Sequence, residues 1–447
     1  MMDTPVCDFV RAYAARSGLR LHMPGHKGAA LLGMEAMDIT EVEGADVLYH
    51  AEGILQKSMG NAASLFGTAR TVYSTEGSTL AIRAMLYLAL LHGKTQRRKS
   101  LILAARNAHK AFMTSAALLD FSVEWLYPET ERSLLSCRIT AEELERRLSG
   151  MAELPAAVYI TSPDYLGAMA DIRGLSAVCR RYGVLLLVDN AHGAYLRFLP
   201  EDRHPISLGA DLCCDSAHKT LPVLTGGAYL HISKGAPALL RSEAEHAMNL
   251  FASTSPSYLI LQSLDAANRY LADGYRQRLA AFAAETAALK QRLTDAGFSL
   301  ASEEPLKLTV SAKVCGQTGE ELADHLRQFG IECEFSDPDY LVLMLTPEIG
   351  TAGLQKLEAA LAAVRFRRMV CDPAPKLPVP ERICSIREAL FAPAEILPAA
   401  QCLGRVFASA AISCPPAVPI VVSGERIDED ALRCFAYYGI KSCRVTK

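Results

Sequence analysis

The fold is decided by one stretch of sequence, Val184-Leu185-Leu186-Leu187-Val188-Asp189-Asn190-Ala191-His192-Gly193. A short apolar run that ends abruptly in an acidic residue predicts a buried strand of a parallel sheet. A carboxylate at the end of such a strand is costly to ionise without a partner, so Asp189 predicts a cationic group opposite it. The alternative is that this aspartate is a buried cap of the next helix.

A second motif follows thirty residues later, Asp215-Ser216-Ala217-His218-Lys219-Thr220, at the end of another apolar run. A lysine at the mouth of a sheet is desolvated and has cationic neighbours, and both effects turn an amine into a nucleophile towards carbonyl groups. By itself the motif is weak, because a surface lysine in a loop is more common.

A third motif, Thr75-Glu76-Gly77-Ser78-Thr79, follows a predicted strand and opens a predicted helix. Backbone N–H groups and two hydroxyls would converge there, where the helix dipole favours an anion. Ser216 and His218 are candidates to complete such a phosphate cup. The ordinary role of a Gly-Ser-Thr helix start is N-capping.

A fourth motif, Arg106-Asn107-Ala108-His109-Lys110, also follows a predicted strand, and His109 could stack on a cofactor ring. Phosphate cup, histidine, aspartate and lysine occur in the order in which a fold-type-I sheet places them around one crevice at its strand ends. Pyridoxal 5'-phosphate has a matching group for each of them: Asp189 would pair with its protonated ring nitrogen and Lys219 would hold its aldehyde as an imine.

Composition bounds the possible functions. The chain has 447 residues, half of them hydrophobic, and a formal net charge of -3. This is enough for two or three domains, and the charge gives no general attraction to nucleic acid. The N-terminus lacks the pattern of a signal peptide and no apolar run is long enough to span a membrane. The thirteen cysteines form no C-x-x-C pair. We therefore expect reduced thiols, no metal site and a cytoplasmic protein.

Short apolar runs alternate with amphipathic segments from about residue 56 to residue 232, as expected of an α/β fold with a mostly parallel sheet. The predicted strands are Arg70–Ser74, Ser100–Ala104, Ser122–Leu126, Ala157–Thr161, Val184–Asp189, Leu212–Asp215 and Gly227–Ile232. The predicted helices are Leu80–Leu91, Lys110–Leu119, Ala141–Leu148 and Leu175–Arg181.

The pattern changes after Ser257, where Tyr258–Ala296 predicts one or two long helices. We expect an N-terminal segment at 1–55, a large cofactor-binding domain at 56–272, a small α+β domain at 273–371 and a C-terminal subdomain at 372–447. The last two regions contain predicted strands at Leu306–Ala312, Glu332–Phe335 and Tyr340–Leu345, helices at Gly319–Phe329 and Ala352–Arg365, a Pro-rich linker at Asp372–Pro380 and a helix from Asp428.

With these motifs in hand, the chain resembles the Orn/Lys/Arg decarboxylase family, and in its compact size the short Gram-positive arginine or lysine decarboxylases. The resemblance covers nearly the whole length. Besides the motifs above, it is carried by Leu21-His22-Met23-Pro24-Gly25-His26-Lys27-Gly28, Ser253-Thr254-Ser255-Pro256-Ser257-Tyr258 and Pro415-Pro416-Ala417-Val418-Pro419.

The resemblance implies an aspartate-aminotransferase-like fold and a role for each motif residue. His109 would stack on the cofactor ring, Asp189 would pair with its nitrogen and Lys219 would hold its aldehyde. His218 would contact the phosphate or reprotonate the product, and His192 would lie in the same pocket. The implied reaction is decarboxylation of arginine, lysine or ornithine, as in polyamine metabolism.

The resemblance also implies a homodimer with shared active sites, in which Thr254 and Ser255 reach the phosphate of the neighbouring subunit. Glu425, in Ser423-Gly424-Glu425, would help to recognise the distal cation of the amino-acid substrate.

Two positions depart from the family pattern, which has Asn before the glycine of the phosphate cup and Glu after the ring aspartate. This chain has Glu76 and Asn190 there. An inward-pointing carboxylate at Glu76 would repel phosphate. The cofactor motifs also leave other reactions open, such as those of an aminotransferase or a C-S lyase, because they do not choose which bond at Cα breaks. A cofactor-binding paralogue with little catalytic activity is a further alternative.

Overall fold

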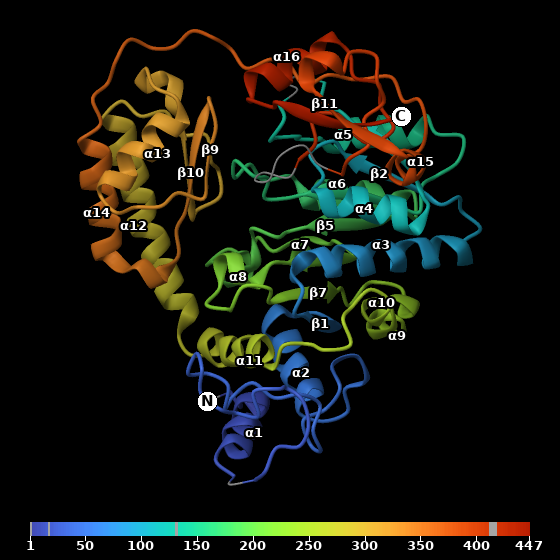
Figure 1. Ribbon diagram of the computed structural model, residues 1–447, viewed down its shortest axis with the longest axis vertical. Coiled ribbons are helices and arrows are strands. Elements are labelled where there is room, and N and C mark those ends of the chain that lie inside the picture. The colour runs from blue at the N-terminus through green and yellow to red at the C-terminus, as the bar shows by residue number, and fades with distance from the viewer. Residues whose placement is uncertain (1, 17, 130–132, 411–417) are drawn as a thin grey trace. The chain divides into compact units, whose positions relative to one another are not determined.

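A computed structural model describes residues 2–16, 18–129, 133–410 and 418–447. The chain forms two compact units, and each is built from two separate segments (Figure 1). The first unit contains Met1–Lys99 and Cys179–Leu279, and the second contains Ser100–Val178 and Ala280–Lys447. Of the motifs quoted above, Pro415, Pro416 and Ala417 lie outside the described residues.

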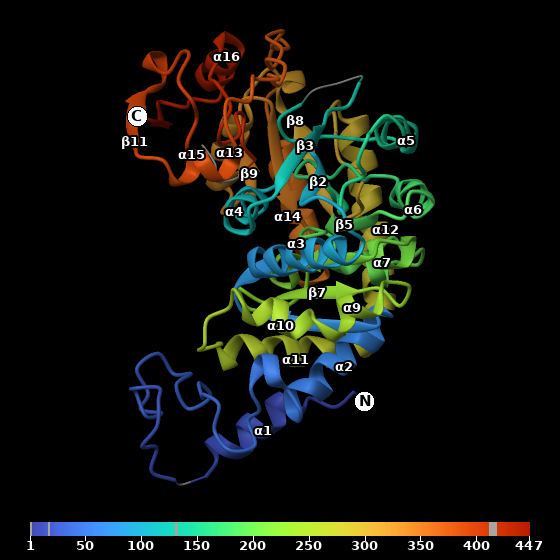
Figure 2. The same ribbon diagram turned by 90° about the vertical axis from the view of Figure 1, so that its right-hand side faces the viewer.

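The first unit is built on four strands in the order β1-β7-β6-β5. β5 and β6 run parallel, whereas β7 runs antiparallel to both β1 and β6. Figure 2 shows helices α3 and α11 on opposite sides of β7. The bounds of these elements are β1 Arg70–Ser74, β5 Leu185–Asp189, β6 Leu212–Asp215, β7 Ala228–Ile232, α3 Gly77–Thr95 and α11 Tyr258–Ala272.

Strand directions bring three of the motifs to one edge of this sheet. Since β7 is antiparallel to both of its neighbours, β1 runs in the same direction as β6 and β5. The carboxyl ends of β1, β5 and β6 therefore share an edge, and the register pairs Asp189 with Cys214 there. The turns that follow Ser74, Asp189 and Asp215 all leave from this edge, which is where ligands bind in sheets of this kind.

The second unit contains three parallel strands in the order β4-β2-β3 and a small antiparallel sheet in the order β8-β10-β9. Its C-terminal part adds a two-stranded ribbon, β11 with β12, and buries an apolar cluster that includes Phe407, Phe435 and Val445. The strand bounds are β2 Leu101–Ala105, β3 Ser122–Leu126, β4 Ala157–Thr161, β8 Lys307–Ser311, β9 Phe335–Ser336, β10 Tyr340–Met344, β11 Ala394–Pro398 and β12 Ser442–Thr446.

The remaining helices complete both units. Two helices of the first unit precede β1 along the chain, α1 Pro5–Ala14 and α2 Ile54–Phe66, and α2 packs on β1. The other helices of eight or more residues are α4 Lys110–Leu119, α5 Ala141–Ser149, α6 Ile172–Arg181, α12 Tyr275–Asp295, α13 Gly319–Gln328, α14 Gly350–Ala362 and α16 Glu429–Tyr437. The shorter ones used below are η2 Ala194–Phe198, α7 Pro205–Leu208, α8 Ala217–Thr220 and α15 Ile386–Phe391.

The seven strands predicted for the α/β part are confirmed, each within one residue at either end. The predicted helices are confirmed with small shifts, and the long region after Ser257 is indeed two helices. The strand predicted at Glu332–Phe335 was placed too early, because only Phe335 and Ser336 pair with β10. The sequence patterns did not predict α1, α2, α15 or the β11/β12 ribbon.

Two other properties follow from the described residues. None of their helices is both long enough and apolar enough to cross a membrane. The cysteines among them are all free thiols.

Candidate cofactor site

The N-terminus of α3 forms a cradle at the shared strand edge. The hydroxyls of Ser78 and Ser216 meet there, with 2.9 Å between their oxygen atoms. Gly77 adopts φ +70°, and a Cβ added to it would meet no described heavy atom within 4 Å, so the space beside the helix start is open. The first-turn amides of a helix have no intrahelical acceptor. Two hydroxyls and a helix N-terminus around open space suit a phosphate group.

Glu76 does not occupy this cradle with its carboxylate. The side chain makes no capping hydrogen bond to α3 and instead accepts the backbone N–H of Ser253 at 2.7 Å. The negative charge is thereby turned towards the segment that carries Thr254 and Ser255, both of which are exposed. The sequence suggested that the Glu76 carboxylate could repel a phosphate. That repulsion would require the side chain to point into the cradle, which it does not do here.

Lys219 lies on α8, in the same turn as one of the cradle hydroxyls. Its backbone N–H donates to the carbonyl oxygen of Ser216, and its Nζ lies 3.0 Å from Nε2 of His192. His218 is held by the start of β7, because both its backbone N–H and its Nδ1 lie within hydrogen-bonding distance of the Gly227 carbonyl oxygen. The turn therefore brings an amine, an imidazole and a hydroxyl of the cradle together.

Asp189 ends β5, with a relative exposure of 2%. One carboxylate oxygen accepts the N–H of Ala191 at 3.2 Å and the thiol of Cys214 at 3.5 Å. His192 follows three residues later and reaches Lys219, so one strand-end turn carries both the buried acid and the partner of the lysine.

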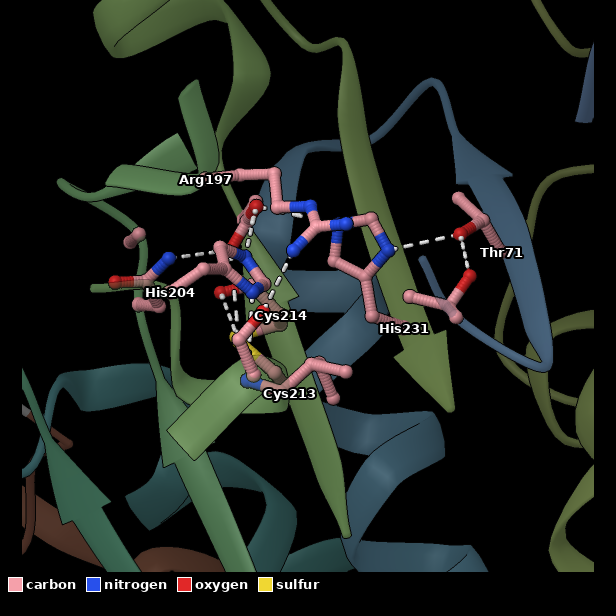
Figure 3. Close-up of polar contacts among 12 residues, drawn as sticks. Thr71, Arg197, His204, Cys213, Cys214 and His231 are labelled. Atoms are coloured by element: carbon pink, nitrogen blue, oxygen red, sulfur yellow. Dashed lines mark hydrogen bonds and ion pairs between the residues drawn. The ribbon is translucent and has the colours of Figure 1, made fainter. Parts of the chain in front are cut away.

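A second buried acid, Asp215, ends the neighbouring strand and is the centre of a hydrogen-bonded network, of which Figure 3 labels His204, His231 and Cys213. Its Oδ2 lies 3.0 Å from Nε2 of His204 and 3.1 Å from Nε2 of His231, and its Oδ1 accepts the side-chain amide of Asn190 at 2.7 Å. Burial alone would raise the pKa of Asp215, but the two imidazoles hold that pKa well below its usual range. These three partners were not predicted from the sequence.

The second unit holds the other two predicted residues. His109 is the N-cap of α4, where its Nδ1 accepts the N–H of Ala111 at 3.1 Å. Glu425 is buried against the guanidinium of Arg106, with 3.6 Å between Oε2 and Nη2. Burial raises the pKa of Glu425, while Arg106 opposes that rise.

The residues of the first unit match the groups of pyridoxal 5'-phosphate. The cradle of Gly77, Ser78 and Ser216 suits its phosphate, the amine of Lys219 suits its aldehyde and the buried carboxylate of Asp189 suits a protonated ring nitrogen. Thr79 follows in the first turn of α3. The structure thus brings eight of the predicted residues of the first unit together at one sheet edge: Gly77, Ser78, Thr79, Asp189, His192, Ser216, His218 and Lys219. The other two, Thr254 and Ser255, lie in an exposed segment.

Comparisons with known proteins identify the family of the chain. A family model described as "Orn/Lys/Arg decarboxylase, major domain" matches residues 4–302. The arginine decarboxylase of Bacillus subtilis (strain 168) is 29% identical, over 96% of this chain and 92% of its own length.

Two solved structures show the same fold. A lysine decarboxylase of Francisella novicida matches with a TM-score of 0.78 and 15% identity, over 99% of this chain and 81% of that one. The constitutive lysine decarboxylase of E. coli matches with a TM-score of 0.75 and 18% identity, over 100% and 82%. Sequence, fold and site agree: the chain belongs to the Orn/Lys/Arg decarboxylase family and is a pyridoxal-phosphate-dependent amino-acid decarboxylase.

Proposed function

We propose that the protein decarboxylates a basic amino acid, with arginine as the first candidate and lysine and ornithine as the others. The products would be carbon dioxide and agmatine, cadaverine or putrescine. One relative that matches over nearly its full length is an arginine decarboxylase, and two of the similar solved structures are lysine decarboxylases.

In the proposed site, each cofactor group has its own protein partner. Gly77, Ser78, Thr79 and Ser216 would bind the phosphate, with His218 beside them, and Lys219 would hold the aldehyde. Asp189 would keep the ring nitrogen protonated, and His109 would stack on the ring. When bound, pyridoxal phosphate supplies an electron sink for the pair left on Cα as carbon dioxide departs.

We propose that the turn from Ser216 to Lys219 carries the residues that move protons. Lys219 Nζ lies 3.0 Å from His192 Nε2, which is a hydrogen-bonding distance at which a proton can be shared. We propose that Lys219 or His218 delivers the proton that Cα needs after carbon dioxide has left, and that His192 orients the lysine amine. The buried acid beside this turn, Asp189, keeps a positive charge favourable in the site.

We further propose that two subunits share the site, in the cytoplasm. The exposed Thr254 and Ser255 follow Ser253, whose amide is held by Glu76. This contact fixes the start of the exposed segment next to the cradle helix. A segment held in this way is suited to reach a phosphate in a neighbouring subunit.

One observation carries the proposal: the turn that presents the Lys219 amine to His192 also supplies the cradle hydroxyl of Ser216. The test is to load the purified protein with pyridoxal phosphate and to measure carbon dioxide and keto acid from arginine, lysine and ornithine. Carbon dioxide with an equal amount of amine is the expected result. Keto acid without carbon dioxide would indicate an aminotransferase, and cofactor binding without any turnover would indicate a paralogue with little catalysis. Either outcome contradicts the proposal.

A further inference from the structure

We call Asp215 and its hydrogen-bond partners His204, His231, Asn190 and Cys213 the Asp215 network. None of these residues has a direct role in the reaction proposed above. The carboxylate is fully buried and has four donors around it. Two are imidazoles, from His204 before α7 and His231 on β7, one is the amide of Asn190, and the fourth is the thiol of Cys213 at 3.5 Å. These four donors can satisfy a charged carboxylate that is buried from solvent.

The proton positions follow from the outer contacts of the two imidazoles. Nδ1 of His204 accepts the backbone N–H of Ile206, so the ring proton must be on Nε2, which faces Asp215. Burial lowers the pKa of His231, and Asp215 opposes this shift. Its Nδ1 lies 2.9 Å from the hydroxyl of Thr71 on β1. Hydrogen-bond donors therefore surround Asp215, whose pKa lies well below its usual range.

His204, Asp215 and His231 are also the one trio among the described residues whose ligand atoms lie close enough to hold a metal ion. The distances of 3.0 and 3.1 Å between nitrogen and oxygen are those of direct hydrogen bonds. A metal would need Nε2 of His204 without its proton, whereas the contact with Ile206 places the proton there. The geometry thus favours a hydrogen-bonded network over a metal site.

The network joins the two turns that carry the cofactor residues. Asn190 lies in the turn between Asp189 and His192, and Asp215 directly precedes Ser216 in the turn that leads to Lys219. Their 2.7 Å hydrogen bond is a side-chain link between these turns. Rotation of either turn would break a buried hydrogen bond to a charged group, which is costly.

We propose that Asp215 is a positioning residue that locks these two turns in the arrangement that binds the cofactor, and that position 190 is an amide because it faces this ionised acid. A carboxylate at position 190 would lie against Asp215 without a cation between them. The acid that the family pattern places after the ring aspartate is thus replaced here by the Asn190–Asp215 pair. The inference rests on the proposed function only in taking pyridoxal phosphate as the ligand.

The test exchanges the two groups with variants of nearly equal shape: Asp215→Asn, Asn190→Asp and the double variant. In Asn190→Asp, two acids share one buried space, so the pKa of one of them must rise. That variant should bind pyridoxal phosphate at least tenfold more weakly. Without cofactor, its melting temperature should drop further below that of the parent as the pH rises from about 5 to about 8, because an acid with a raised pKa in the folded state costs stability as pH rises. Asp215→Asn should also bind more weakly, but without this added pH dependence.

The double variant tests whether the hydrogen bond between positions 190 and 215 is what holds the two turns. The amide introduced at position 215 could donate to the carboxylate introduced at position 190, and its oxygen could accept from the two imidazoles, which restores the pattern. We expect the double variant to bind pyridoxal phosphate at least threefold more tightly than the weaker single variant and to lose the added pH dependence. Anything less overturns the proposal, and so does one equivalent of a transition metal in the purified parent protein.

A matched control is available on β7. The hydroxyl of Tyr229, whose residue pairs with Asp215 in the sheet register, is buried without a hydrogen-bond partner among the described residues. Tyr229→Phe should therefore leave cofactor affinity unchanged. The ionisable groups around Asp215 that the pH measurements must consider are His204, His231, Tyr229, Cys213, Cys214, Asp189 and, beyond His231, Arg197.

The outcome separates the two proposals. If the parent binds pyridoxal phosphate but releases no carbon dioxide from a basic amino acid, the proposed substrate class is wrong, and the affinities still test Asp215. If the parent does not bind pyridoxal phosphate at all, the proposed function fails, and melting of the four proteins without cofactor still shows whether the exchange restores the pair.

Discussion

At the scale of single residues, the chemistry of the site depends on a few close approaches in the backbone. Gly193 is one of them. Its turn brings the backbone so near to Asn190 that a Cβ added at Gly193 would lie 2.0 Å from Oδ1 of that residue and 2.7 Å from Cδ1 of Leu196. Only a residue without a side chain leaves room for the amide that Asp215 binds.

We predict that Gly193→Ala lowers the melting temperature of the protein without cofactor and weakens binding of pyridoxal phosphate at least tenfold, because Asn190 must move. Gly60→Ala is the matched control. Gly60 lies within α2 and a Cβ there would meet nothing within 4 Å, so this change should be neutral or stabilising by about 0.5 kcal/mol. Equal melting temperatures for the two variants would show that the close approach does not matter.

The cradle gives a second prediction at this scale. Because Glu76 bonds to Ser253 and not to α3, Glu76→Gln should leave the affinity for pyridoxal phosphate within about threefold. Ser78→Ala and Ser216→Ala each remove a cradle hydroxyl and should each cost about tenfold, which corresponds to one charge-assisted hydrogen bond. A titration of the cofactor measures all three. A larger loss for Glu76→Gln than for the serine variants would contradict the placement of the phosphate.

Sequence alone placed the lysine, the aspartate and the cradle at strand ends, and the structure has them there; their roles towards the cofactor stay predictions. The sequence was not sufficient for the Asp215 network. His204 and His231 are separated by one strand and several turns, and nothing in their neighbours marks them as partners of the same acid. The orientation of the Glu76 side chain could not be predicted from the sequence either, since its hydrogen-bond partner Ser253 lies 177 residues away.

At the scale of elements, one buried ion pair fastens the C-terminal part of the second unit to the end of β2. Arg106 donates to the carbonyl oxygens of Pro419 and Ile420 at 2.8 and 2.9 Å, and its guanidinium also faces Glu425. Oε2 of Glu425 in turn accepts the N–H of Val422. The role predicted for Glu425 in substrate recognition thus stays a prediction, beside this visible role as an anchor.

We predict that Glu425→Gln lowers the free energy of unfolding by about 3 kcal/mol, because it leaves the buried Arg106 charge without its acid. Glu381→Gln breaks the exposed pair with Arg426 in the same region and should have almost no effect. Urea unfolding measures both changes. A KM for the substrate that rises in Glu425→Gln well beyond that of an equally destabilised variant would support recognition, and an unchanged unfolding energy would contradict the anchor.

The elements themselves show where sequence patterns succeed. Buried parallel strands such as β5 were predicted to the residue or nearly so, because apolar runs between polar turns have few alternatives. The ribbon of β11 and β12 was missed, since its paired residues lie 44 to 52 positions apart in the sequence and Ile396 is 70% exposed. An exposed, non-local pairing leaves no clear periodic pattern.

At the scale of the whole molecule, stability should depend on pH through a buried acid in the second unit. Burial raises the pKa of Glu304 to about 7, although Lys307 opposes the shift. An acid with a raised folded-state pKa favours the folded protein at low pH, and this contribution is lost as pH rises from about 4.5 towards 7.

We predict that the free energy of unfolding of the parent contains a component that falls with a slope of up to about 1.4 kcal/mol per pH unit in that window, and that Glu304→Gln removes it. Denaturant unfolding at pH 5, 6 and 7 measures the difference between the two proteins. The idea is wrong if the two slopes agree.

The division into an N-terminal segment, a large domain, a small domain and a C-terminal subdomain remains a prediction, as does the homodimer. Alternation of strands and helices could establish the α/β class, and the motif order could establish the cofactor. Neither pattern encodes which surfaces meet a second subunit.

The central claim is that Lys219 and the residues around it bind pyridoxal phosphate for decarboxylation of a basic amino acid. The most direct test is release of carbon dioxide from arginine, lysine and ornithine by the cofactor-loaded parent and by Lys219→Ala. We expect release from at least one of the three, with an equal amount of amine, and a rate at least 1000-fold lower (about 4 kcal/mol) in Lys219→Ala. No release from any of the three, or an undiminished rate in the variant, would contradict it.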